Sequence, residues 1–203
     1  WDKAEALLAN ALKKSGISYE IKEGDGAFYG PKIDIEVEDS LGRKWQCPTC
    51  QLDFNLPERF NTQYEGSDGK KHQAVMIHRA ILGSLERFMG VMIENYAGAF
   101  PTWLSPVQVK VLTFTDRNID YSNKITEKLK EHGLRAEIDS SAETVQNKVR
   151  RAQLEKVPFI LVCGDKEEQA GTLAVRTRDG KVKFGVKTED FIAEISKLIS
   201  EKK

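Results

Sequence analysis

The chain has little of what would place a protein in a membrane, outside the cell or on a polyanion. It has no apolar run near the ~20 residues that a membrane-spanning helix needs. Three cysteines in 203 residues cannot all pair with one another, so we expect a protein of a reducing compartment. The 31 Lys and Arg balance the 31 Asp and Glu, which excludes nucleic-acid binding by bulk positive charge. Any RNA contact must come from a local patch.

The chain also lacks an N-terminal Met, a signal peptide, internal repeats and low-complexity segments. It begins at Trp1, and residues 1–14 carry apolar side chains at helical spacing. We therefore expect a piece of a longer protein. The length suits one large or two small domains, each with its own core, and we expect two.

The first half has the alternating pattern of antiparallel sheet. Ile33, Ile35 and Val37 alternate with acidic residues, which predicts a half-buried strand, and the turn at 39–43 returns it as a hairpin into residues 44–47. Along 51–56 the period is again two. Gln51, Asp53 and Asn55 then share one face, and because dry burial of such groups is costly we expect them to line a wet cleft.

Residues 65–71 read as an exposed loop before a strand at 74–78 and a helix from about Ile81. One face of that helix is apolar, and the other carries Gly83, Ser84, Arg87 and Gly90. Glycines beside an arginine let a ligand approach the backbone, and a guanidinium suits bidentate contact with phosphate. Taken alone, the helix is better explained as an ordinary surface helix.

The second half alternates strands with helices. Pro101 and Pro106 follow the helix, so we place the domain boundary between 104 and 105. Strands are expected at 107–111, 134–138 and 159–163, a hairpin at 172–177 and 182–186, and helices around 121–129, from a capping box at Ser140 and Glu143 to about 156, and from 188 onward. This pattern predicts a compact α/β domain. Basic residues cluster at 148–151 and on the hairpin. Such clusters are usually solvated faces, but the presence of two in one small domain raises the expectation of RNA as a partner.

Several motifs occur in order along the chain. They are residues 1–5, 26–32 (GAFYGPK), 45–47 (WQC), 51–54 (QLDF), 77–80 (IHRA), 100–108 (FPTWLSPVQ), 162–167 (VCGDKE) and 174–177 (AVRT). Together they resemble the threonyl-tRNA synthetases, and the resemblance covers nearly the whole chain. It implies the end of an α+β class II catalytic core, an antiparallel sheet with helices in residues 1–104, followed by an α/β anticodon-binding domain in 105–203.

The resemblance implies roles for side chains of the first domain. The face from Gly83 to Gly90 matches the third signature motif, so Arg87 would hold the terminal phosphate of ATP, bound with Mg²⁺, and stabilise the transition state by its charge. Lys32 would lie near the carboxylate and the forming acyl phosphate. Gln46 and Ser84 would also bind ATP. Tyr29, Thr49 and Gln51 would bind threonine.

His78 matches the third zinc ligand of the family. Zinc bound to the substrate hydroxyl can reject valine but not serine. The other two ligands, and signature motifs one and two, would lie upstream of Trp1, so this chain alone would not form the complete active site. Cys47 and Cys50 offer a competing structural zinc site, but no second cysteine pair exists. We read Cys50 as a small hydrophobe, and His72 and His132 as surface residues.

In the second domain, Glu167 and Arg176 match positions that read anticodon bases. The chain departs from the family near Ala142, where relatives carry a side chain able to hydrogen-bond a base. Ser141 or Asn147 is a possible replacement for that contact.

The resemblance therefore implies a threonine-tRNA ligase, cytoplasmic and dimeric in its full-length form, that uses ATP, threonine and threonine tRNA without a membrane. The alternative is a noncatalytic RNA-binding or regulatory paralogue. A bare binding module has no physical need of the predicted site residues, so their retention argues against the paralogue; they are Tyr29, Lys32, Gln46, Gln51, His78 and Arg87.

Overall fold

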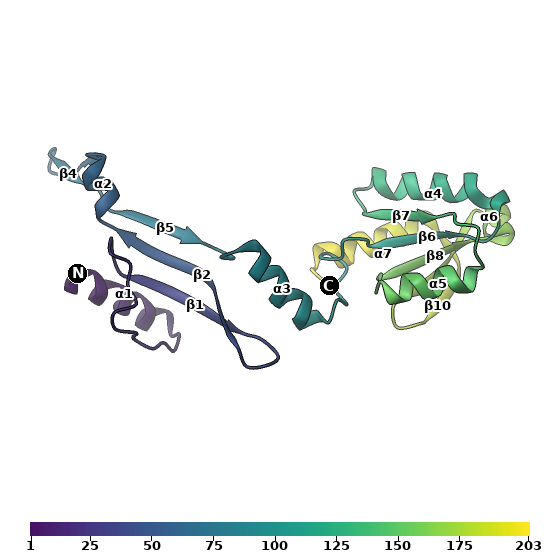
Figure 1. The fold of residues 1–203 in the computed structure, drawn as a ribbon. Helices are drawn as coiled ribbons and strands as arrows, with labels where there is room; N and C mark the ends of the chain where they lie inside the picture. The colour runs from purple at the N-terminus through teal and green to yellow at the C-terminus, as the bar shows by residue number, and fades with distance from the viewer. The chain divides into compact units, whose positions relative to one another are not determined.

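The computed structural model describes residues 1–203, which divide into two compact units, Trp1–Asn95 and Tyr96–Lys203 (Figure 1). This division falls earlier in the chain than the boundary predicted between 104 and 105. No helix is both long enough and apolar enough to cross a membrane.

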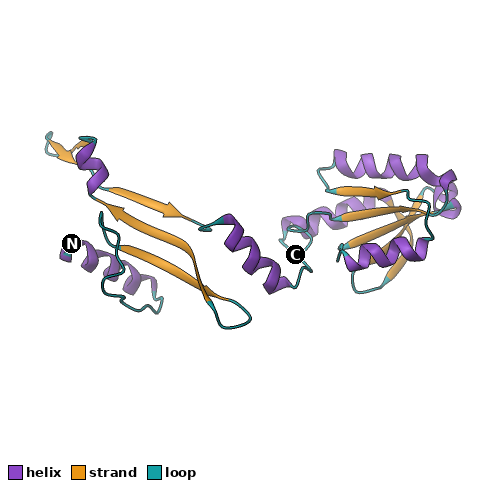
Figure 2. Cartoon of the chain, viewed as in Figure 1, coloured by secondary structure: helices purple, strands orange, loops and turns teal.

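The first unit is a three-stranded antiparallel sheet with helices, as its alternating sequence predicts (Figure 2). The strand order is β1-β2-β5, and strands β3 and β4 form a separate hairpin. The elements are α1 (Asp2–Ser15), β1 (Lys32–Glu38), β2 (Lys44–Asp53), α2 (Asn55–Arg59), β3 (Gln63–Glu65), β4 (Lys71–Gln73), β5 (Met76–Ala80) and α3 (Leu85–Tyr96).

Two local predictions for this unit are wrong, and one is confirmed. The two short strands expected at 44–47 and 51–56 are a single strand, β2, followed by the short helix α2. The exposed loop expected at 65–71 is confirmed as the turn of the β3–β4 hairpin, whose two short strands were not predicted. Helix α3 begins at Leu85 rather than Ile81, because Gly83 has φ +74°, which a right-handed helix cannot accommodate.

The apolar face of α3 has little cover within this chain. None of its residues is buried, and Leu85, Met89 and Ile93 are exposed. The well-buried core of the molecule lies in the second unit, where Val109, Val111, Leu161 and Leu173 of the sheet are completely inaccessible to solvent.

The second unit is an α/β domain built on a five-stranded sheet in the order β10-β9-β8-β6-β7. Strand β6 runs parallel to β7 and β8, and the other pairs are antiparallel. The elements are β6 (Val109–Thr113), η1 (Asp116–Asn118), α4 (Ile119–Glu131), β7 (Ala136–Asp139), α5 (Val145–Leu154), β8 (Phe159–Cys163), α6 (Asp165–Ala170), β9 (Thr172–Thr177), β10 (Val182–Lys187) and α7 (Thr188–Ser200).

Helices cover both faces of this sheet (Figure 1). The larger apolar cluster includes Leu129 of α4, Leu161 of β8 and Ile195 of α7, each fully buried. A smaller cluster joins Ala152 of α5 to Leu112 and Ile160 on the sheet. The predicted α/β order and the hairpin β9–β10 are therefore confirmed.

The capping box predicted at Ser140 and Glu143 is wrong. Helix α5 has Thr144 as its N-cap, whose side-chain oxygen accepts from the backbone N–H of Asn147. The side chain of the neighbouring Ser141 donates a hydrogen bond to Asp139.

The first residues of the second unit, 96–108, are tied to the rest of that unit through their backbone carbonyls. Arg135 donates from Nε to Ser105 O (2.9 Å) and from Nη2 to Trp103 O (2.8 Å). Arg178 donates from Nη2 to Phe100 O at 2.7 Å. Gln108, 1% exposed, donates to Thr102 O and accepts from the backbone N–H of Arg135.

Candidate functional site

A row of predicted site residues crosses the sheet of the first unit. Lys32 on β1 pairs with Gln51 on β2, and Gln51 pairs with His78 on β5. Residues directly opposite in neighbouring strands point to the same face of a sheet, so three residues distant in sequence share one surface. Tyr29, just before β1, donates its hydroxyl to Gln51 Oε1 at 3.0 Å.

Asp34, which was not among the predicted site residues, contacts three of them. Its carboxylate lies 2.6 Å from Lys32 Nζ, and it accepts hydrogen bonds from Thr49 Oγ1 (2.6 Å) and Gln46 Nε2 (2.7 Å). Partial burial alone would raise the pKa of Asp34, but the hydrogen bonds from Lys32 and Thr49 outweigh that effect and lower the pKa. The hydrogen bond between Lys32 and Asp34 also raises the pKa of Lys32, so at neutral pH both of these side chains are charged.

A signal for Asp34 was present in the sequence. It lies two residues after Lys32 in an alternating strand, and residues i and i+2 share a face. What the sequence could not supply is the register, which has an irregularity between Asp34 and Glu36 and brings Gln46 and Thr49 to the same carboxylate.

Arg87 lies at the start of α3, exposed to solvent. Its Nη1 donates to Gln46 O at 2.8 Å, and its guanidinium lies 5.7 Å from the centre of the Trp45 ring. The N–H of Arg87 donates to Ser84 Oγ at 3.3 Å. Arg87 is thus held beside β2 with donors left free, an arrangement suited to an anionic ligand.

Gly83 allows this approach of α3 to β2. A Cβ placed on Gly83 would lie 2.1 Å from Cys47 O, far inside van der Waals contact. Gly30 makes an equally close approach to β2, with its added Cβ 2.1 Å from Leu52 O. Both glycines of these motifs are therefore required by packing.

His78 is held by a buried carboxylate. His78 Nε2 lies 2.8 Å from Asp53 Oδ2, and Asp53 is 1% exposed. The expectation that Asp53 faces a wet cleft is wrong, because its two oxygens are already satisfied inside the protein. Burial alone would raise the pKa of Asp53, but hydrogen bonds from His78 and from the backbone N–H groups of Leu56 and Asn55 lower it.

No group of three or more His, Cys, Asp or Glu side chains is arranged to hold a metal ion. His78 fits the requirements of a single zinc ligand, because a carboxylate on one ring nitrogen of a ligating histidine is usual around zinc. Cys47 is buried and Cys50 half-buried, both as free thiols. His72 and His132 are exposed, as predicted.

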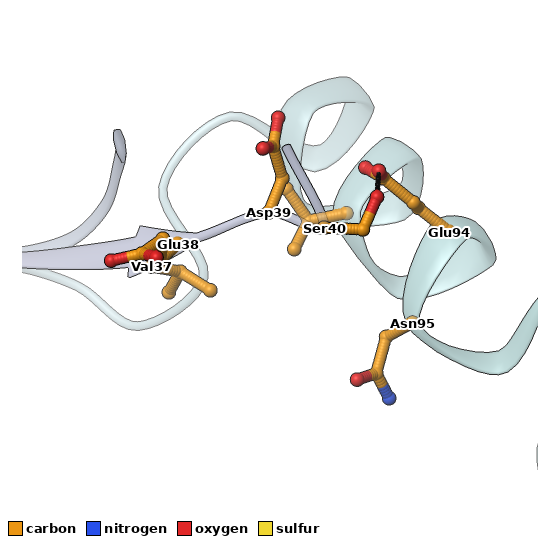
Figure 3. A pocket seen from close by; sticks show the side chains of 7 residues that line it. Val37, Glu38, Asp39, Ser40, Glu94 and Asn95 are labelled. Carbon is orange, nitrogen blue, oxygen red and sulfur yellow. Dashed lines mark hydrogen bonds between the residues drawn. The ribbon is translucent and has the colours of Figure 1, made fainter. Parts of the chain in front are cut away.

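A cavity of about 240 Å³ lies elsewhere on this unit, between the end of β1 and α3 (Figure 3). Its lining includes Glu38 and Glu94, and Ser40 hydrogen-bonds Glu94 across it. None of the predicted site residues lines it. Because its charged lining groups are acidic, it is poorly suited to a phosphate or carboxylate ligand.

In the second unit, the two predicted anticodon-reading residues lie near opposite ends of β8, on the elements next to it. Glu167 is in α6, just beyond the carboxyl end of β8, and its Oε2 accepts from the backbone N–H of Gly164 (3.1 Å). Arg176 on β9 pairs with Ile160 near the amino end of β8. Its side chain, partly exposed, makes no hydrogen bond or ion pair within the unit, so its donors are free.

The basic residues at 148–151 differ in whether their side chains are engaged within the unit or free. Lys148 is 2% exposed, and its Nζ donates to Thr113 O and Oγ1, so it cannot reach RNA. Arg151 pairs with Asp139 and Glu143. Arg150, exposed, is the residue of this run that remains open to solvent.

Ser141 and Asn147 differ in whether their side chains are free to make the base contact that Ala142 cannot make. Ser141 donates its hydroxyl to Asp139 Oδ1 at 2.7 Å and accepts from Arg151 Nη2 at 3.0 Å. Asn147 is exposed and its side-chain amide makes no hydrogen bond. Of the two predicted replacements, Asn147 has the unused donor and acceptor.

Comparison with known proteins assigns both units. Residues 2–96 match the family model of the tRNA synthetase class II core domain (G, H, P, S and T), and residues 108–198 match that of the anticodon binding domain. A threonine–tRNA ligase of Desulfatibacillum aliphaticivorans is 57% identical over 96% of this chain, and one of Thermotoga petrophila is 49% identical over all of it. The chain spans about a third of these relatives, 31% and 32% of their length.

A solved structure is similar throughout. The RNA binding domain of threonyl-tRNA synthetase from Cryptosporidium parvum superimposes with a TM-score of 0.88 at 39% identity, covering 98% of this chain and 50% of that one. The expected fold, the end of a class II synthetase core followed by an anticodon-binding domain, is thereby confirmed. The domain boundary predicted between 104 and 105 stays a prediction, since neither family model covers residues 97–107.

Proposed function

Because the chain belongs to the threonyl-tRNA synthetase family, we propose that it is part of a threonine-tRNA ligase that activates threonine with ATP and transfers it to threonine tRNA. One observation carries the proposal: Lys32, Gln46, Thr49 and Gln51, predicted to bind threonine and ATP, share one sheet face, joined through Asp34 and the register of three strands. A noncatalytic RNA-binding paralogue has no use for such a surface.

Arg87 and Lys32 supply the charge in this proposal. Arg87 binds the terminal phosphate of ATP, and its fixed position beside β2 lets it stabilise the charge on departing pyrophosphate without reorganisation. Lys32 stabilises the carboxylate of threonine as it attacks the α-phosphate. Gln46 and Ser84 flank these two and orient ATP, which carries Mg²⁺. Binding geometry and charge, rather than proton transfer, supply the catalysis.

Tyr29, Thr49 and Gln51 orient the amino acid. The bond from Tyr29 to Gln51 fixes both side chains before threonine arrives, and Thr49 is held in the same way by Asp34. His78 is one ligand of a Zn²⁺ ion in the full-length enzyme. That ion, when bound, supplies a Lewis acid that selects the hydroxyl of threonine over the methyl of valine.

The second unit reads the anticodon through Glu167, Arg176 and Asn147. A free guanidinium and a carboxylate address the edges of splayed bases, and their placement near opposite ends of β8 lets them contact different bases. The exposed amide of Asn147 takes the place of the family's contact at position 142.

We propose that the full-length protein is a homodimer of the cytoplasm that acts without a membrane. Light scattering on the full-length protein measures its mass, and a monomer would contradict the dimer.

Binding of this chain to threonine tRNA, beside the same tRNA with its second and third anticodon bases exchanged, tests the anticodon proposal. We expect weaker binding of the exchanged tRNA at one fixed salt concentration. Arg176→Ala should abolish the difference, whereas Lys181→Ala removes the same charge from an exposed pair with Asp179 and should preserve it. Equal binding of both tRNAs by the unmodified chain would favour a generic RNA-binding protein.

A further inference from the structure

Asp53 is the least exposed charged residue of the chain, with 1% of its surface accessible. Its Oδ1 accepts hydrogen bonds from the backbone N–H groups of Asn55 (2.9 Å) and Leu56 (3.0 Å) at the start of α2. Its Oδ2 lies 2.8 Å from His78 Nε2. The two backbone donors fix the plane of the carboxylate, so Oδ2 is aimed at one nitrogen of the imidazole.

This contact determines which nitrogen of His78 is free. An ionised carboxylate can only accept hydrogen bonds. A neutral His78 therefore carries its proton on Nε2 and presents the lone pair of Nδ1. The side chain of His78 is 39% exposed, so the imidazole is anchored on one side and open on the other.

We propose that Asp53 is the positioning residue of the site, which fixes the tautomer and orientation of His78 so that Nδ1 is the ligand atom offered to a divalent cation. The proposal rests on the proposed role of His78 as a zinc ligand. Asp53 lies 25 residues from His78 in the chain and reaches it only because β2 and β5 pair in the register Gln51 to His78.

The substitution Asp53→Asn reverses the hydrogen bond with almost no change of volume. The amide oxygen can keep both backbone donors, and the NH₂ group then faces His78 Nε2. A donor at that position requires Nε2 to accept, which moves the proton of the imidazole to Nδ1 and removes its lone pair.

Nitrogen-15 NMR of the imidazole rings measures the tautomer directly, and the chain has only three histidines. We expect the Nε2–H form of His78 in the unmodified chain and the Nδ1–H form in D53N. The Nδ1–H form in the unmodified chain would overturn the proposal without any variant. So would an unchanged tautomer in folded D53N.

Asp39→Asn is the matched control. Asp39 is also buried and also accepts from two backbone N–H groups, those of Leu41 and Arg43, but its remaining contacts are with Trp45 and Arg43 rather than a histidine. D39N should perturb the fold locally and leave the tautomer of His78 unchanged. A change of tautomer in D39N would show that general loosening, rather than the contact with Asp53, controls the ring.

Measuring zinc affinity in the full-length protein that contains this chain distinguishes the proposed role of Asp53 from the proposed role of His78. We expect zinc affinity to fall about 10- to 100-fold in D53N, the usual effect of losing such a partner, and zinc to be lost in H78A. Full zinc affinity in D53N with a reversed tautomer would overturn the role of Asp53. Full zinc affinity in H78A would refute the proposed role of His78, while the tautomer result would still report whether Asp53 controls the ring.

Discussion

Substituting Gly83 by alanine tests how the arginine-bearing helix is packed against the sheet. Gly83 has φ +74°, and an added Cβ would lie 2.1 Å from Cys47 O. An L-residue in the left-handed region costs roughly 1–2 kcal/mol, and overpacking at a backbone contact costs a further ~1–3 kcal/mol. We therefore expect Gly83→Ala to destabilise the chain by about 2–5 kcal/mol.

Gly90→Ala is the matched control, because it is the same substitution seven residues later. A Cβ on Gly90 meets nothing within 4 Å, and its φ is ordinary. In the interior of α3 alanine is favoured over glycine by roughly 0.5–1 kcal/mol. Gly90→Ala should therefore stabilise the chain slightly, so the two substitutions are expected to have opposite signs.

Thermal unfolding followed by circular dichroism measures both variants. For a chain of this size 1 kcal/mol shifts Tm by about 2–4 °C. Gly83→Ala should thus lower Tm by about 4–20 °C, and Gly90→Ala should raise it by about 1–4 °C. Equal Tm values for the two variants would refute the close contact between Gly83 and Cys47.

Two further predictions concern titratable groups of the second unit. Burial alone would raise the pKa of Asp139, but Arg151 and Ser141 lower it from 3.8 to about 2, so its stabilising contribution is complete above pH ~4 and is lost as the pH falls toward ~2. Arg151→Ala should flatten the acid limb of a Tm-against-pH curve and Arg150→Ala should not; identical limbs would contradict the pairing. Burial raises the pKa of Cys163 to about 11, so in the native chain half-buried Cys50 should react with iodoacetamide faster than Cys163, as read by mass spectrometry; equal rates would contradict the burial of Cys163.

The sequence predicted best the elements whose pattern repeats several times. Ile33, Ile35 and Val37 specify strand β1 because alternation over one strand places apolar groups on one face. The apolar run 159–163 likewise became β8 in the centre of the α/β sheet. In β8 the local pattern and the buried face agree, whereas in β1 the pattern predicted the strand but not its burial, because Ile35 is 45% exposed.

Contacts that depend on strand register could not be predicted from the residues alone. Asp34 and Asp53 were visible as polar residues of alternating strands, but their partners lie 12 to 25 residues away. The capping box at Ser140 failed for a local reason, since Thr144 caps the helix and Glu143 pairs with Arg151. The resemblance to a family supplied the site residues, and the geometry added the carboxylates that hold them.

The anchoring of residues 96–108 has a consequence for how this segment can change over time. Arg135 and Arg178 hold Ser105, Trp103 and Phe100 by their carbonyl oxygens, which every amino acid possesses. The path of residues 96–108 is therefore determined by arginines distant in sequence, while these contacts leave the side chains of the segment free to vary. A single substitution of Arg135 removes the hydrogen bonds to two carbonyls at once. Substitutions should therefore be tolerated better within residues 96–108 than at Arg135 and Arg178.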